Sequence, residues 1–308
     1  MWRCAALAAL ISVAGSETIQ VEVRNSEVWL IRDGAAQQLT HDGKSKWQAL
    51  LSPQRDEIAY YESCPQAEHC TPSVVILDLE GRRVKSFQVL GRGFGPPEPC
   101  MSINSISWIQ QSSIAADCHI TPSAGEYIET DIATGKVVRD LFGLDFTPSP
   151  DGQKVAHVGG IIHFAPPYAQ SYYLQVENTT IYPLPEGVGP VEQEKLVQPP
   201  SVVRNEGSTY YGIHEFSPGL SWSPDSQRIA LIDCTFDWTA KDPSSLSPVG
   251  TVSNRRCFIT VVALDGKYSE LYPIEASELR TQNRDLSWVN AHELVLEING
   301  SKKSIPVP

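Results

Sequence analysis

The sequence is poor in positive charge. Its 24 Lys and Arg residues stand against 36 Asp and Glu residues, which gives a formal net charge of −12 at pH 7. Such a surface repels nucleic acid and anionic lipid, so we expect no nucleic-acid binding. Nothing approaches the roughly 20 consecutive apolar residues of a membrane-spanning helix, which predicts no membrane span. Apolar positions at helical spacing are nearly absent too, and this excludes a helical domain.

The first residues have the pattern of a secretory signal peptide. Arg3 is followed by an apolar run over residues 4–13 and then by the small residues Ala14, Gly15 and Ser16. A positive residue, an apolar run and small residues, in that order, are typical of a cleaved leader. We therefore predict a signal peptide over residues 1–16 and a single mature domain over residues 17–308, periplasmic or secreted. A buried N-terminal strand is the alternative.

The cysteines indicate an oxidising compartment. Seven are present, and without Cys4, which the leader would remove, six remain. An even number in an exported protein predicts disulfides. They form three couples that are local in sequence: Cys64 with Cys70, Cys100 with Cys118, and Cys234 with Cys257. Zinc is the alternative, but no Cys-x-x-Cys occurs, and His69 and His119 follow no ligand spacing. We predict no metal and no cofactor.

One turn motif recurs along the chain between short β-branched and aromatic runs. Residues 52–59, 149–156 and 223–230 align without gaps around Ser-Pro, and residues 108–115 and 288–295 are shorter copies. Pro at the first turn position and Asp or Gly after it favour a tight hairpin. A second hairpin follows each copy, except that the fifth second hairpin, residues 28–40, stands at the beginning of the chain.

This arrangement predicts an all-β chain folded as a β-propeller over residues 17–308. The half-unit permutation is that of a ring closed by one blade built from N- and C-terminal strands, which leaves no sheet edge open. We predict five blades. Six is the alternative, because residues 18–24 and 303–307 could each add a further strand.

The repeats resemble those of the TolB family, which are WD40-like. The resemblance lies in Gln37-Gln38-Leu39-Thr40, Trp47, the stretch from Leu51-Ser52-Pro53 to Ile58-Ala59-Tyr60-Tyr61, and Leu220-Ser221-Trp222-Ser223-Pro224-Asp225. It spans about residues 23–298 and is specific for the fold. The chain shows no separate α/β domain before the propeller, and five blades would be one fewer than TolB has. The family's partner, a peptidoglycan-associated lipoprotein, is therefore only weakly implied.

The longer insertions all fall on one predicted face of the propeller. They are residues 62–73, 88–103, 157–171, 185–218, 235–256 and 273–284. We interpret them as loops that form a recognition face for an envelope protein partner or a small ligand. The candidate residues are aromatic or imidazole: His163, Phe164, Tyr168, Tyr210, Tyr211, His214, Phe216, Phe236 and Trp238. Packing of each against its own blade is the alternative.

These observations favour a monomeric binding module without catalytic residues. Trp108, Trp222 and Trp288 recur at one position of the repeat and are predicted core residues. The alternative function is a propeller-fold glycoside hydrolase, with acids at the innermost strands such as Asp145, Glu215 and Asp285. Solvated turn residues are the plainer interpretation of those acids. No Gly-x-Ser-x-Gly motif indicates a serine hydrolase.

Overall fold

The computed structural model describes residues 18–63, 72–91, 96–100, 102–121, 124–159, 172–184, 186–192, 204–241, 250–275, 278 and 284–308. The predicted leader and the predicted Cys64–Cys70 disulfide lie outside these residues. The chain divides into two compact units between Phe87 and Gln88. Among the described residues no helix is long and apolar enough to cross a membrane.

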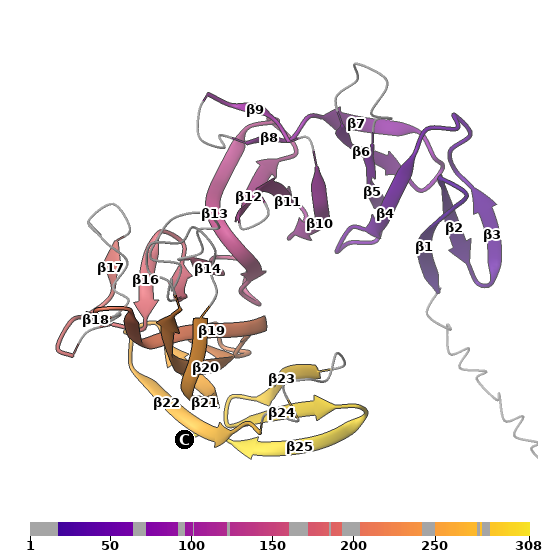
Figure 1. Cartoon of the computed structure of the whole chain (residues 1–308). Coiled ribbons are helices and arrows are strands. Elements are labelled where there is room, and N and C mark those ends of the chain that lie inside the picture. The colour runs from indigo at the N-terminus through magenta and orange to yellow at the C-terminus, as the bar shows by residue number, and fades with distance from the viewer. Residues whose placement is uncertain are drawn as a thin grey trace, which may run out of the picture. The chain divides into compact units, whose positions relative to one another are not determined.

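The first unit contains two antiparallel sheets (Figure 1). Their strands are β1 (Ile19–Arg24), β2 (Glu27–Arg32) and β3 (Ala35–Gln38), then β4 (Lys46–Leu51), β5 (Glu57–Glu62), β6 (Ser73–Asp78) and β7 (Arg83–Phe87). In each sheet the strands pair in chain order. Apolar residues of β2, among them Val28 and Leu30, pack with Ile58 and Tyr60 of β5. This packing buries one face of each sheet.

The second unit is also built of antiparallel strands that pair in chain order within each sheet. Its strands are β8 (Leu90–Gly91), β9 (Glu98–Pro99), β10 (Ile103–Ile109), β11 (Ser113–Thr121), β12 (Ala124–Asp131), β13 (Val137–Pro148), β14 (Val155–Gly159), β15 (Tyr173–Val176), β16 (Thr179–Tyr182), β17 (Val191–Glu192), β18 (Arg204–Glu206), β19 (Thr209–Trp222), β20 (Arg228–Ala240), β21 (Gly250–Ala263), β22 (Tyr268–Pro273), β23 (Arg284–Asn290), β24 (Glu293–Ile298) and β25 (Ser301–Pro306). Strand β13 pairs with β12 up to Gly143 and with β14 from Leu144 onward. It therefore closes one four-stranded group and opens the next.

The three gap-free repeats form the same turn. In each, the buried serine accepts a hydrogen bond on its Oγ from the amide five residues later, at 3.1 Å for Ser52, 3.0 Å for Ser149 and 2.9 Å for Ser223. The hydroxyl thus satisfies a backbone donor that the turn would otherwise leave unpaired. All five predicted first hairpins are antiparallel strand pairs.

The tryptophans join successive sheets at equivalent positions. The indole Nε1 of Trp222 donates to the carbonyl oxygen of Thr147 at 2.8 Å, and that of Trp288 donates to Ser221 at 3.0 Å. Thr147 and Ser221 each stand two residues before the serine of their repeat turn. In these two places the first hairpin strand of one repeat is therefore held to the first hairpin strand of the preceding repeat by the same contact. Repetition of one sheet-to-sheet relation is the architecture of a β-propeller, as predicted.

The two ends of the chain form more strands than one blade needs. Strands β1 and β25 are present, and β1-β2-β3 and β23-β24-β25 are separate three-stranded sheets. Four-stranded blades are the usual unit of a propeller. The number of blades and the blade shared by the two ends stay predictions.

The loop interpretation was wrong for parts of several insertions, since β8, β9, β17, β18 and the end of β14 lie within them. The longest strand segments are in two of the insertions. Residues 209–218 belong to β19, residues 235–240 to β20 and residues 250–256 to β21. Thr209 pairs with Thr239, and Ala240 pairs with Gly250. The Thr, Tyr and Trp residues here favour extended strands, and the same blade simply continues outward.

Candidate functional site

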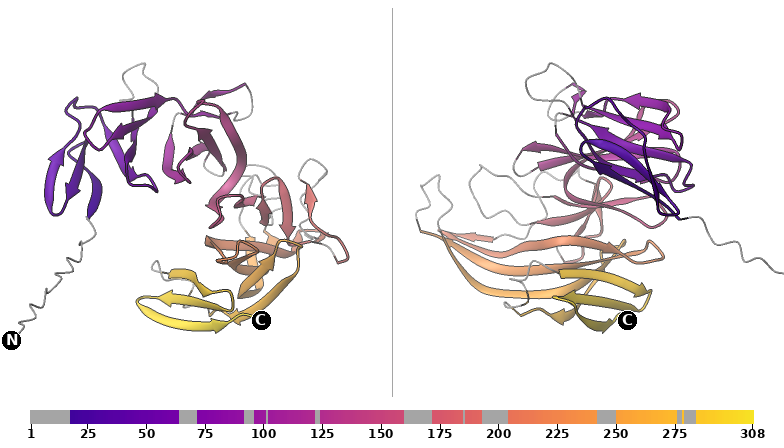
Figure 2. Two further views of the ribbon diagram at one scale, coloured as in Figure 1. Left: turned by 180° about the vertical axis from the view of Figure 1, so that it is seen from behind. Right: turned by 90° about the vertical axis from the view of Figure 1, so that its right-hand side faces the viewer.

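Three strands of the second unit extend beyond the part of their sheet that pairs with β22, and the short strand β18 pairs with β19 over residues 209–211. We call this extension the ribbon; it consists of residues 209–215 of β19, 235–240 of β20 and 250–256 of β21. Strand β22 pairs with β21 only from Phe258 onward, and the last contact is the Ile274 amide to the Cys257 oxygen at 2.8 Å. The long strands are seen in orange in Figure 2.

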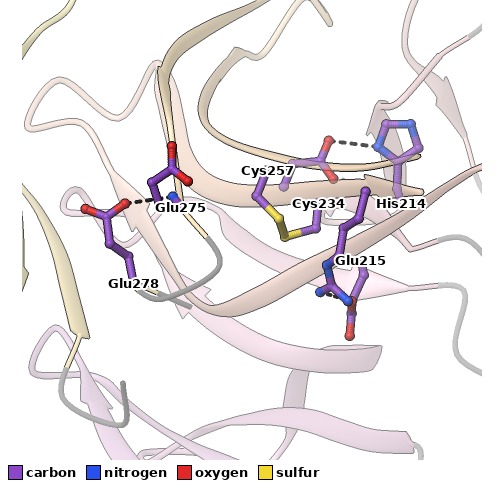
Figure 3. Close-up of a disulfide and its surroundings, with 8 residues drawn as sticks. His214, Glu215, Cys234, Cys257, Glu275 and Glu278 are labelled. Atoms are coloured by element: carbon purple, nitrogen blue, oxygen red, sulfur yellow. Dashed lines mark hydrogen bonds and ion pairs between the residues drawn. A yellow bond between two sulfur atoms is a disulfide. The ribbon is translucent and has the colours of Figure 1, made fainter. Parts of the chain in front are cut away.

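A disulfide lies where the ribbon begins. Cys234 and Cys257 are directly opposite each other on β20 and β21, with Cα atoms 4.0 Å apart, and both are buried (Figure 3). The pairing predicted from the sequence is confirmed. So is the disulfide between Cys100 and Cys118, whose Cα atoms are 6.0 Å apart. Each fixes a local segment of the second unit, and the first of them ties the base of the ribbon.

The face of the ribbon that carries the disulfide also carries an ion pair. Glu215 lies opposite Cys234, and its Oε2 is 2.6 Å from Nη2 of Arg255 (Figure 3). The guanidinium of Arg255 lies over the ring of Phe236, 5.5 Å from the ring centre. A planar cation stacked on an aromatic ring is a favourable contact that leaves polar N–H groups at the surface.

Further along the same face, two aromatic rings are in contact. Tyr210 and Trp238 lie with ring centres 5.7 Å apart, and both side chains are half-buried. The Trp238 ring packs directly on Gly250, since a Cβ there would lie 2.2 Å from it. The structure thus brings together three predicted residues, Tyr210, Phe236 and Trp238. We call these three and Arg255 the aromatic face.

The other side of the sheet holds a buried polar network. Asp233 accepts hydrogen bonds on Oδ2 from the Tyr182 hydroxyl at 2.6 Å and from the His214 ring nitrogen Nδ1 at 2.7 Å. Burial, and then the negative charge of Asp233, raise the pKa of Tyr182. Phe216, only 4% exposed, stacks on Tyr182. His214 and Phe216 therefore pack β19 against β16, and a direct role in recognition stays a prediction.

Of the remaining residues of the predicted recognition face, the structure describes Tyr211. Tyr211 is half-buried on β19 opposite Arg204. His163, Phe164 and Tyr168 lie outside the described residues.

Two carboxyl groups form an electrostatic pair that the sequence did not reveal. Burial, and then the charge of Asp117, raise the pKa of Asp145, and burial raises the pKa of Asp117 itself. Burial followed by the charges of Glu215 and Asp145 raises the pKa of Tyr172. Of the other candidate acids for a hydrolase, Glu215 forms an ion pair with Arg255, and Asp285 is exposed. In the part of the chain that is described, no group of three His, Cys, Asp or Glu side chains could hold a metal ion.

Comparison with known proteins gives structural similarities only. No family model and no curated protein sequence matches the chain. TolB from Acinetobacter baumannii is similar at 16% identity and a TM-score of 0.35, over 94% of this chain and 63% of that one. The β-propeller domain of the trilobed protease from Pyrococcus furiosus is similar at 10% identity and a TM-score of 0.37, over 93% of this chain and 92% of that one.

The tricorn protease is similar at 10% identity and a TM-score of 0.42, over 94% of this chain and 32% of that one. The chain thus spans about three fifths of the length of the Acinetobacter TolB chain. A second similar structure is described as a putative TolB, from Agrobacterium tumefaciens. These similarities concern the fold, and the activities of the proteins are not transferred with it.

Proposed function

We propose that the chain is an exported, TolB-like β-propeller scaffold that binds a protein partner of the cell envelope through the aromatic face and has no enzymatic activity. The observation that supports this most is the ribbon itself, which continues past the end of β22 and is tied at its base by Cys234–Cys257. It presents Trp, Tyr and Arg side chains, the types that dominate binding energy at interfaces. A tied ribbon also loses less entropy on binding than a free loop.

Export is supported by two independent features. The first residues carry the order of a secretory leader, and two disulfides are formed in the second unit. Disulfides persist in oxidising compartments such as the bacterial periplasm. We propose a periplasmic or secreted location for residues 17–308.

We also propose that the six-blade alternative is the better count. The terminal sheets together hold six strands, β1 to β3 and β23 to β25. One four-stranded blade would leave two of them unused.

The partner proposal is tested by capture from an envelope extract of the source organism with residues 17–308 as bait. The change is Tyr210→Ser with Trp238→Ser. We expect captured partner to fall by about 30-fold or more, as for a pair of hot-spot residues. The control is Val138→Ser, because Val138 is an apolar side chain of β13 that is 59% exposed. Equal capture by both variants would contradict the proposal.

A second candidate function rests on the two carboxyl groups with raised pKa values. A carboxyl group whose pKa is raised near a second carboxyl is the arrangement of glycoside hydrolases, and the charge of Asp117 contributes to the raised pKa of Asp145. A panel of oligosaccharides tests it. Hydrolysis by the wild type that is lost in Asp145→Asn would favour the hydrolase over the scaffold, and no hydrolysis across the panel would remove it.

A further inference from the structure

The outer edge of β21 has no neighbouring strand along the ribbon. The pairing with β22 covers residues 258–262, and among the described residues no strand pairs with that edge over residues 250–256. All six side chains from Thr251 to Arg256 are exposed. Such an edge presents backbone donors and acceptors on which a further strand can form.

The hydrogen-bond pattern shows which backbone groups point to this edge. The Ala240 amide donates to the Ser208 oxygen at 2.8 Å, so the backbone of Ala240 faces away from β21. In an antiparallel pair of strands, two residues directly opposite each other either both direct their N–H and C=O groups toward the partner strand or both direct them away from it, and these two kinds of pair alternate along the ladder. Gly250, opposite Ala240, and Val252, opposite Trp238, therefore direct their N–H and C=O groups to the open edge. This stretch is free of register shifts.

The edge is positively charged in a chain that is otherwise strongly acidic. Arg255 and Arg256 are adjacent on it, and residues 250–256 contain no acidic residue. Arg255 is paired with Glu215, whereas no carboxylate among the described residues pairs with Arg256. The chain as a whole carries a formal charge of −12. An acidic segment would be repelled by most of the surface of this acidic chain and attracted to the edge of β21 that carries the arginines.

Charge and irregularity on the edge also exclude other strands. The register shift between Thr235 and Asp237 adds a residue to β21, and Asn254 there has a φ of 54°. Bulges and charged residues normally protect an edge from indiscriminate pairing. Arg256 disfavours a basic strand on this edge, and it favours a strand that brings carboxylates.

Building on the proposed function, we propose that the partner binds as an extended acidic segment that adds a strand to the outer edge of β21 beside Val252, with its carboxylates directed to Arg256. The backbone bonds supply the pairing, and Arg256 supplies the selection by charge. The aromatic face lies on the same ribbon and can contact the rest of the partner.

The probe is a short fluorescein-labelled peptide of alternating Val and Glu, titrated with residues 17–308 in fluorescence anisotropy. A Val and Gln peptide of equal length is its uncharged match. We expect the acidic peptide to bind more tightly, by about tenfold at low salt, and the difference to shrink as salt screens the charges. Equal binding of the two peptides, or no binding of the acidic one, would overturn the proposal.

Two variants test the edge itself. Val252→Pro removes the outward amide while leaving the β20–β21 bonds in place, since proline is tolerated where the N–H faces solvent. We expect this variant to bind the acidic peptide at least about tenfold more weakly than the wild type does. Val252→Ala, which keeps the amide, should change the affinity by less than about threefold. Arg256→Glu should reverse the preference toward a Val and Lys peptide. That reversal does not depend on how the proline variant folds.

The outcomes separate this proposal from the function on which it rests. If the envelope partner is still captured by Val252→Pro and Arg256→Glu but not by the Tyr210 and Trp238 variant, the strand addition is wrong and the scaffold function stands. If the wild type captures no partner, the scaffold function fails. A concentration-dependent dimer that Val252→Pro abolishes would assign the edge to a second copy of the chain and overturn the acidic segment.

Discussion

His157 should make the fold sensitive to acid. Its side chain lies in β14 and is 1% exposed, with Nε2 2.8 Å from the carbonyl oxygen of Glu177. The ring also contacts Phe146, with centres 5.4 Å apart. On the other side the backbone at Gly143 approaches closely, since a Cβ there would lie 2.5 Å from Nδ1. The imidazole therefore has little room for the hydration that its charged form needs.

This burial lowers the pKa of His157 from 6.5 to about 4. Above pH 6.5 the ring is neutral in both the folded and the unfolded chain, and stability does not depend on its protonation. Between pH 6.5 and 4 only the unfolded chain takes up the proton, so the free energy of unfolding falls as the pH falls. Since one unit of pKa difference corresponds to about 1.4 kcal/mol, the full loss is about 3 kcal/mol.

The test is His157→Gln, which removes the titrating group and keeps an amide that can donate to the same carbonyl. The free energy of unfolding in urea is measured for both proteins at several pH values from 7.5 to 4. The wild type should lose about 3 kcal/mol relative to the variant over the acid range. The matched control is His292→Gln at an exposed position. If the difference between the wild type and His157→Gln does not change with pH, the ring is not held neutral by burial and the reasoning fails.

Two further substitutions test other parts of the fold. Lys46→Met in the first unit should lower the free energy of unfolding in urea by about 3 to 5 kcal/mol, because loss of the Lys46 ammonium would leave the buried Glu27 carboxylate without its cation. An unfolding midpoint equal to that of the wild type would show that the ion pair contributes nothing. Trp222→Phe should cost about 1 kcal/mol through the lost bond to Thr147, whereas Trp29→Phe, at an indole nitrogen without a hydrogen-bond partner, should cost less, and equal losses would contradict the role of the repeated indole bond.

The repeat turns could be predicted from the sequence because their causes are local. Ser149, Pro150 and Asp151 determine the turn within six residues, and the hydroxyl of Ser149 reaches a backbone amide only five positions away. The disulfides of the second unit were predictable for the same reason, since Cys234 and Cys257 are near neighbours in sequence. The repetition of these local units then indicated a propeller.

The candidate site could be predicted only in part, because its contacts depend on register and on packing between sheets. The sequence predicts Tyr210 and Trp238 as aromatic loop residues, but the contact between them follows from the pairing of β19 with β20. The influence of Asp117 on Asp145 joins β11 to β13 and has no signal in spacing. The outer edge of β21 is open because β22 ends before the ribbon, and no local sequence pattern predicts where β22 ends.

The position of Cys234–Cys257 explains how a narrow ribbon can present a defined surface. A slip of one residue between β20 and β21 would move Phe236 and Trp238 to the opposite face, because side chains alternate along a strand. The disulfide lies at Cys257, whose carbonyl oxygen accepts the last hydrogen bond between β21 and the segment after β22, from the amide of Ile274. Beyond it, register depends on the ribbon alone, and narrow sheets are only marginally stable. A cross-link at that point closes a loop over a sequence separation of 23 residues and contributes about 3 kcal/mol in the chain-entropy model. It therefore stabilises the one register in which the aromatic face and the open edge of β21 exist together.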